Sequence, residues 1–179
     1  FSDDLRIRSM EADCLYAGIM IDTNNFTTRA GVRTFEAAAF LRRSGADVTR
    51  VRKMLRDNLE SYQARAEAVR TAHIYRDCFA IARCPSEGVD SPTVVGAQAA
   101  NELLDIEGIR ASFVLTVYQG RIYVSARSID EVNVQVMMEK MGGGGHMNIA
   151  GAQVKASPDE VEKMLKDIID KEYQEERVK

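Results

Sequence analysis

The stretch MGGGGHMNIAGAQ, residues 141–153, governs the interpretation of the whole chain. Four consecutive glycines lead into His146, and small residues follow at Ala150, Gly151 and Ala152. Ordering a glycine run costs conformational entropy, so such a run is expected where the backbone takes positive φ or must touch a ligand. Its unobstructed N–H groups can point at a phosphate, to which His146 can also donate. The alternative is a flexible surface turn, in which the histidine would have no purpose.

Composition and charge describe an ordinary globular chain. The 179 residues suffice for one domain or two small ones. A net charge of −3 gives no support for bulk binding to nucleic acid, although it allows a local positive pocket. No apolar run approaches the ~18 residues of a membrane span. The opening FSDDLRIR has neither a secretory signal nor an initiator methionine, so we expect a soluble, cytoplasmic piece of a longer protein.

The three cysteines have no metal-ligand spacing. An odd number of cysteines fits reduced thiols in a cytosolic setting. Cys14 and Cys78 lie in apolar sequence and are therefore predicted to be small core residues.

The first 72 residues predict helices only. Apolar residues recur at helical spacing over residues 8–21 and 35–43, and Thr34 is the expected N-cap of the second helix. Asp47 is expected to cap one long helix over residues 48–72. Its apolar residues form a narrow stripe at helical spacing, so the helix would either connect two domains or pack in a dimer.

The turn after the first helix contains a candidate functional carboxylate, Asp22. It is either a turn or cap residue or a ligand of a hard metal ion. Arg29 and Arg33 flank Gly31 in the loop that follows, where they are either solvated or within reach of an anion near Asp22.

The remaining residues predict an α/β domain with a small mixed sheet. Its expected elements are a strand at 73–84, a helix at 93–104 after Pro92, a hairpin of 109–118 and 121–127 around Gln119 and Gly120, a helix at 134–141 capped by Asn133 or Asp130, a strand at 149–156, and a helix from 159 to about 175 capped by Ser157. His73, the only histidine besides His146, is expected on an edge strand rather than as a ligand.

Three parts of this domain could converge on a phosphate. Ser125 and Arg127 end a strand, Asn133 begins a helix, and the glycine run carries His146. Arg127 could supply a bidentate fork, although an arginine here could equally be an ordinary surface residue. The constellation lacks a catalyst, because metal-assisted phosphate hydrolysis needs several Asp or His ligands and Asp22 is the one candidate.

Four segments together resemble the bacterial cyclic-di-AMP phosphodiesterases of the DHH phosphoesterase superfamily. They are GIMIDTNNFTTRAGVRTFEAAAFLRRSGAD at 18–47, VSARS at 124–128, VNVQ at 132–135 and GGGGHMNIAGAQ at 142–153. The resemblance covers residues 11–172. It implies three parts. Residues 1–46 would be the C-terminal part of a DHH domain, residues 47–72 a connecting helix, and residues 73–179 the DHH-associated substrate-binding domain.

The resemblance also implies a function. The parent protein would be a hydrolase with two Mn²⁺ ions that opens cyclic-di-AMP to linear pApA, anchored in the bacterial inner membrane by N-terminal helices. Asp22 matches its last metal-binding motif. The family residues that hold the substrate phosphate are matched by Arg127, Gly143, Gly144 and His146. Beside them lie Ser125 and Asn133, which the resemblance also assigns to substrate binding.

The earlier metal motifs of the family, including the DHH triplet, do not occur here. We therefore expect this chain alone not to hydrolyse cyclic-di-AMP. We also expect an exposed apolar face at Leu15, Ile19 and Phe35, through which the chain could form a homodimer. A nanoRNase or phosphoadenosine phosphatase of the same superfamily, and a non-catalytic nucleic-acid-binding module, are the alternatives. The acidic balance argues against long nucleic acid as the partner.

Overall fold

The computed structural model describes residues 6–129 and 132–176, which divide into two compact units between Asp57 and Asn58. Within these residues the chain forms seven helices and one six-stranded sheet, which confirms the predicted α/β class. No helix among them is both long and apolar enough to cross a bilayer. Each unit has its own hydrophobic core and is described by itself.

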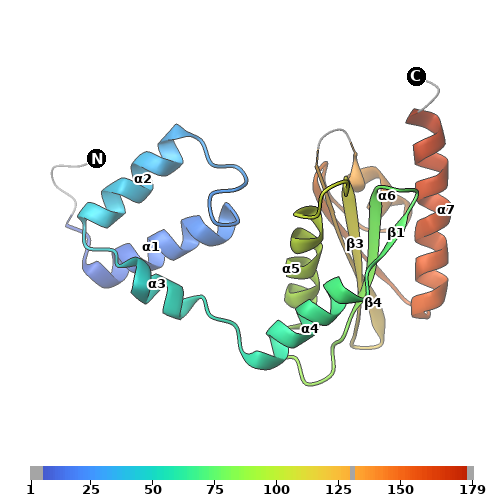
Figure 1. The fold of residues 1–179 in the computed structure, drawn as a ribbon, viewed down its shortest axis with the longest axis horizontal. Helices are drawn as coiled ribbons and strands as arrows, with labels where there is room; N and C mark the ends of the chain where they lie inside the picture. Colours follow the sequence, from blue (N-terminus) through green and yellow to red (C-terminus); the bar gives the residue numbers. More distant parts are fainter. Residues whose placement is uncertain (1–5, 130–131, 177–179) are drawn as a thin grey trace. The chain divides into compact units, whose positions relative to one another are not determined.

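The first unit consists of three helices, α1 (Ser9–Asp22), α2 (Val32–Arg43) and α3 (Val48–Met54) (Figure 1). Its small core is built on Ala12, Leu41 and Ala46. Helix α2 begins three residues earlier than predicted, so Thr34 is not its N-cap. Gly31 occupies the N-cap position with extended backbone, and the Thr34 Oγ1 accepts a hydrogen bond from the Gly31 N–H at 3.3 Å.

A buried carboxylate organises the corner between α2 and α3. Asp13, only 4% exposed, accepts hydrogen bonds from the Arg50 Nε at 2.6 Å and from the Asp47 N–H at 2.7 Å. Arg50 also donates to the Gly45 carbonyl at 2.9 Å. Because a buried charge is tolerated only when it is paired, this network explains how Asp13 can lie inside a helical core.

The predicted single helix over residues 48–72 is wrong. Asp47 caps α3 as expected, because its Oδ1 accepts from the Thr49 and Arg50 N–H groups. The helix then stops, and Asn58 caps a separate helix α4 (Leu59–Arg70) by accepting from the Ser61 N–H at 2.8 Å. An Asn side chain that binds the backbone locally favours such a new start over a continuous helix.

The large apolar residues predicted to form the buried stripe of this segment are not buried in α4. Leu59 and Tyr62 are 64% and 59% exposed. The helix instead buries Ser61, Ala64 and Ala68, since these small side chains allow close packing against the sheet and α5.

The prediction that Cys14 and Cys78 are core residues is correct for one of the two. Cys14 in the first unit is exposed, whereas Cys78 in the second unit is buried. The predicted apolar surface is present: Leu15 and Phe35 are each 53% exposed, while Ile19 packs partly against the core.

The sheet of the second unit has the strand order β1-β2-β3-β4-β6-β5. Its strands are β1 (His73–Tyr75), β2 (Phe79–Cys84), β3 (Ala111–Tyr118), β4 (Arg121–Ser128), β5 (Gly144–His146) and β6 (Ile149–Val154). Only β2 and β3 pair in parallel, joined through α5 (Pro92–Leu104), and all other pairs are antiparallel. The strand predicted at 73–84 is broken into β1 and β2 by Arg76 and Asp77, which both take positive φ.

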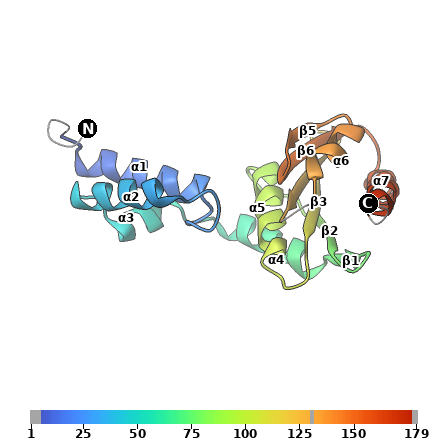
Figure 2. The same ribbon diagram turned by 90° about the horizontal axis from the view of Figure 1, so that it is seen from above.

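Helices cover both faces of this sheet. Figure 2 shows α4 and α5 on one side and α6 (Val134–Lys140) and α7 (Pro158–Glu176) on the other. Alternate residues of β4 follow this division, because Ile122, Val124 and Ala126 belong to the core under α6 and α7. The residues between them point to the face of α5, which packs on β2, β3 and β4. The part of that face formed by β6 and β5 includes the exposed Gln153 and Ile149.

Candidate functional site

The glycine run is not the simple loop that the sequence predicts. Gly144 begins the short strand β5, which pairs with β6 in an antiparallel hairpin. A Cβ added at Gly143 would lie 2.1 Å from the Gly151 carbonyl oxygen, and one added at Gly145 would lie 2.5 Å from the Ala150 Cα. These two glycines are therefore required by close packing against β6. A Cβ at Gly144 would meet nothing within 4 Å, so this position is open.

The strand register brings predicted site residues together. Arg127 on β4 pairs with Ile149 on β6, which pairs with His146 on β5. The next row, two residues away, is Ser125, Gly151 and Gly144. Residues directly opposite each other in an antiparallel pair direct their side chains to the same face. We define the open face by these residues together with the next row: Arg127, Ile149, His146, Ser125, Gly151, Gly144, Tyr123 and Gln153.

Arg127 is half-buried and held from α5. Its Nε donates to the Asn101 Oδ1 at 2.9 Å, and its Nη1 donates to the Ala126 carbonyl at 2.9 Å. Asn101 is a functional candidate that the sequence reasoning missed. Its polar side chain within the apolar helix segment was the available signal, but only the folded structure gives the partner.

Asn133 has a structural function. Its Oδ1 accepts hydrogen bonds from the Gln135 and Val136 N–H groups at 3.1 and 3.4 Å, which makes it the N-cap of α6, as one of the two predicted alternatives. The other alternative, Asp130, lies outside the described residues. The core contacts of α6 lie on the other face of the sheet, but its start adjoins the end of the predicted site. The Val134 N–H donates to the Met147 carbonyl at 2.9 Å, and the Ser128 hydroxyl donates to the Val132 carbonyl at 2.6 Å, so the residues that flank Asn133 contact the neighbours of His146 and Arg127.

A hollow of about 450 Å³ lies on the open face beside the glycine run. It is lined by Thr93, Arg121, Tyr123, Val124, Ser125, Gly142, Gly143, Gly151, Ala152 and Gln153. Ser125 and Gly143 are predicted site residues, whereas Tyr123 and Gln153 were missed. Tyr123 on β4 and Gln153 on β6 lie on the same face of the sheet as Ser125. The sequence alone could not identify them, because their common face follows only from the strand register.

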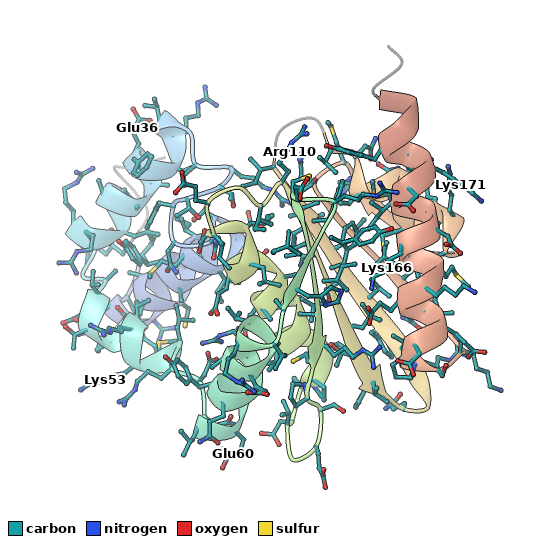
Figure 3. All side chains as sticks on the ribbon, turned by 45° about the vertical axis from the view of Figure 1, so that its right-hand side comes forward. Glu36, Lys53, Glu60, Arg110, Lys166 and Lys171 are labelled. Atoms are coloured by element: carbon teal, nitrogen blue, oxygen red, sulfur yellow. The ribbon has the colours of Figure 1, made fainter. Side chains whose placement is uncertain are left out.

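The far side of the sheet carries a paired charge network. Arg83 contacts Asp159 at 2.5 Å and Glu162 at 2.7 Å, and Glu162 also contacts Lys166, which Figure 3 labels on α7. The His73 Nε2 lies 3.4 Å from Glu162, at the edge strand where the sequence predicted this histidine. These ion pairs join β1 and β2 to α7, so their function is structural.

Asp22 is the last residue of α1, in the first unit. Its side chain is 77% exposed and lies 4.0 Å from the Arg29 Nη1. Among residues 6–129 and 132–176, no group of three or more His, Cys, Asp or Glu side chains could hold a metal ion. A single exposed carboxylate does not fit a two-metal centre, so the donor set described here is insufficient for one.

Comparison with known proteins gives relatives that include cyclic-di-AMP phosphodiesterases. The chain is 43% identical over 167 residues to the cyclic-di-AMP phosphodiesterase PdeA of Listeria monocytogenes, which covers 92% of this chain and 25% of the relative. It is 40% identical over 173 residues to the cyclic-di-AMP phosphodiesterase GdpP of Bacillus subtilis, covering 95% of this chain and 26% of the relative. The chain thus spans about a quarter of the length of these curated relatives.

The fold is found in solved structures. An exopolyphosphatase-related protein from Bacteroides fragilis superimposes with a TM-score of 0.79 at 22% identity, over 92% of this chain and 51% of that chain. The sequence model of the DHHA1 domain matches residues 78–174, which contain the open face, the glycine run and most of α7. This chain therefore belongs to the DHHA1 domain family.

Proposed function

We propose that this chain is the C-terminal, substrate-binding portion of a phosphodiesterase that hydrolyses cyclic-di-AMP to pApA. The observation that carries the proposal is the row of Arg127 and His146 beside the open position at Gly144. The names of the relatives from Listeria monocytogenes and Bacillus subtilis supply the substrate. In this proposal, residues 1–46 belong to the DHH domain, 47–72 connect the domains and 73–179 bind the substrate.

Each residue of the row has a distinct binding function. The Arg127 guanidinium presents a planar set of donors that matches a phosphate better than a point charge does. Its bond to Asn101 holds the group in place before the ligand arrives, which reduces the entropy lost on binding. His146 donates from the other end of the row, and Gly144 lets the phosphate approach the backbone between them.

The hydrolytic step is assigned to the longer parent protein. We propose that Asp22 is one ligand of a manganese centre whose other ligands lie outside this chain, and that the parent is membrane-anchored and dimeric. The chain alone is accordingly expected to release no pApA from cyclic-di-AMP in the presence of Mn²⁺. Chromatography of the products tests this, and manganese-dependent pApA formation by the purified chain would contradict it.

Calorimetric titration with cyclic-di-AMP and with pApA tests the binding function. The His146→Ala variant is expected to bind both ligands about ten- to a hundredfold more weakly, because a hydrogen bond to a charged group contributes roughly 1.5–3 kcal/mol. The matched control is His73→Ala, which removes the other histidine from the edge strand β1 and should leave the affinity unchanged. Equal affinities for all three proteins, or no binding to the unsubstituted chain, would refute the proposal.

A further inference from the structure

The hollow on the open face contains side chains to which phosphate binding assigns no function. Tyr123 and Gln153 are direct partners across β4 and β6, and both line the hollow. Arg121, exposed at the first residue of β4, lines it as well. These residues begin one row beyond Ser125, Gly151 and Gly144. The Tyr123–Gln153 row lies two residues, roughly 6.5–7 Å, from the row of Gly144, and four residues, roughly 13–14 Å, from the row of Arg127 and His146. The first separation suits the reach of one nucleotide from a phosphate at Gly144 across the ribose to the base.

Tyr123 provides an aromatic surface that is held in place. Its ring lies 5.9 Å from the ring of Tyr118, with an interplanar angle of 59°. This tilted contact and the half-buried position restrict the ring before a ligand binds. A nucleobase can stack on such a ring, and stacking tolerates any base because every base has a π-face.

Gln153 adds a group that can tell bases apart. Its side chain is exposed, and within the described part of the chain the structure records no hydrogen bond for its amide. A glutamine amide offers one donor and one acceptor together, which match the N7 acceptor and the N6 donor of adenine. Guanine presents two acceptors on the same edge, N7 and O6, and pairs better with an arginine.

We propose that this hollow binds one adenine base of the dinucleotide, with Tyr123 stacked on the ring and Gln153 bound to its N6 and N7 edge. Arg121 adds positive charge near the attached ribose phosphates. This inference rests on the proposed function and extends it, because it makes Gln153 a specificity-determining residue for adenine. Gly151, which has no side chain, separates this base site from the row of Arg127 and His146.

The proposal is tested with a substitution that should shift the preference of the chain from adenine toward guanine. Dissociation constants for cyclic-di-AMP and cyclic-di-GMP are measured by calorimetry for the unsubstituted chain and for Gln153→Arg. The unsubstituted chain is expected to favour cyclic-di-AMP. Gln153→Arg is expected to shift the ratio of the two constants toward cyclic-di-GMP on the order of ten- to a hundredfold, since an arginine pairs with both guanine acceptors. Tyr123→Leu should weaken both ligands on the order of tenfold without changing the ratio.

The matched control is Gln63→Arg, which introduces the same charge on α4. Gln63 is exposed, and α4 packs mainly on α5 and β2, so this variant should leave both affinities unchanged. Circular dichroism verifies that every variant is folded. An unchanged ratio in Gln153→Arg, together with binding that still depends on His146, would overturn the base site alone. Failure of the unsubstituted chain to bind either dinucleotide would overturn the base site and the proposed function together.

Discussion

The two neighbouring glycines Gly143 and Gly144 should respond differently to the same substitution. A Cβ at Gly143 would lie 2.1 Å from the Gly151 oxygen and 2.6 Å from the Ala152 Cα. Both atoms belong to a paired strand, so neither can move without disturbing the β4–β6–β5 ladder. Overpacking of this kind costs about 1–3 kcal/mol, and we expect Gly143→Ala near the upper end because the clash is with backbone.

Gly144→Ala should leave the stability nearly unchanged. Its added Cβ meets no atom within 4 Å, and its φ is not in the left-handed region. The expected change is within about 0.5 kcal/mol, the range of ordinary surface substitutions. The same methyl group stands on the open face in the row of Ser125 and Gly151, so we expect weaker binding of cyclic-di-AMP despite the intact fold.

Urea unfolding followed by circular dichroism gives both stabilities, and calorimetry gives both affinities. If Gly143→Ala proves as stable as the unsubstituted chain, the glycine run does not pack against β6 as described. If Gly144→Ala binds with full affinity, the ligand does not approach the glycine position on the open face.

Three further predictions concern single side chains. The Arg50 hydrogen bond lowers the pKa of Asp13, so this carboxylate contributes stability above its ordinary pKa of about 3.9 that is lost as the pH falls through the lower folded-state pKa. Acid unfolding of Asp13→Asn should lack this component, and identical acid profiles would contradict it. Burial raises the pKa of the Cys84 thiol to about 11, whereas Cys14 is exposed, so iodoacetamide at pH 8 should label Cys14 first by mass spectrometry and Cys84 only after unfolding. Equal labelling rates would count against the packing of β2. Asn101→Ala should weaken cyclic-di-AMP binding less than Arg127→Ala does, because it removes the group that positions the guanidinium and leaves the guanidinium itself. Calorimetry of the two variants decides this, and full affinity in Asn101→Ala would exclude a positioning function.

Local signals in the sequence were sufficient for several elements. Pro92 begins α5, Asn133 caps α6, and Gln119 and Gly120 form the turn between β3 and β4, each with positive φ. Ser157 caps α7 in a reciprocal arrangement with Glu160. Each of these features depends on residues within four positions of each other, and this is why the chain order alone identifies them.

The remaining features depend on partners that are distant in sequence. Gly144 was predicted in a loop, but its pairing with Gly151 makes it part of a strand. The helix break before Asn58 was missed because an apolar period continued across it, although the folded chain buries Ala64 and Ala68 instead. Asn101 became a candidate only when its bond to Arg127 was seen.

The most direct test of the central claim is to locate the ligand on the chain. Amide resonances of the isotopically labelled 179-residue chain are followed by NMR during titration with cyclic-di-AMP. The account predicts that the largest changes occur on the open face, at Arg127, Gly144 and His146, while amides of α7 change little. Changes concentrated on α7 or in the first unit, with the open face unaffected, would contradict the account.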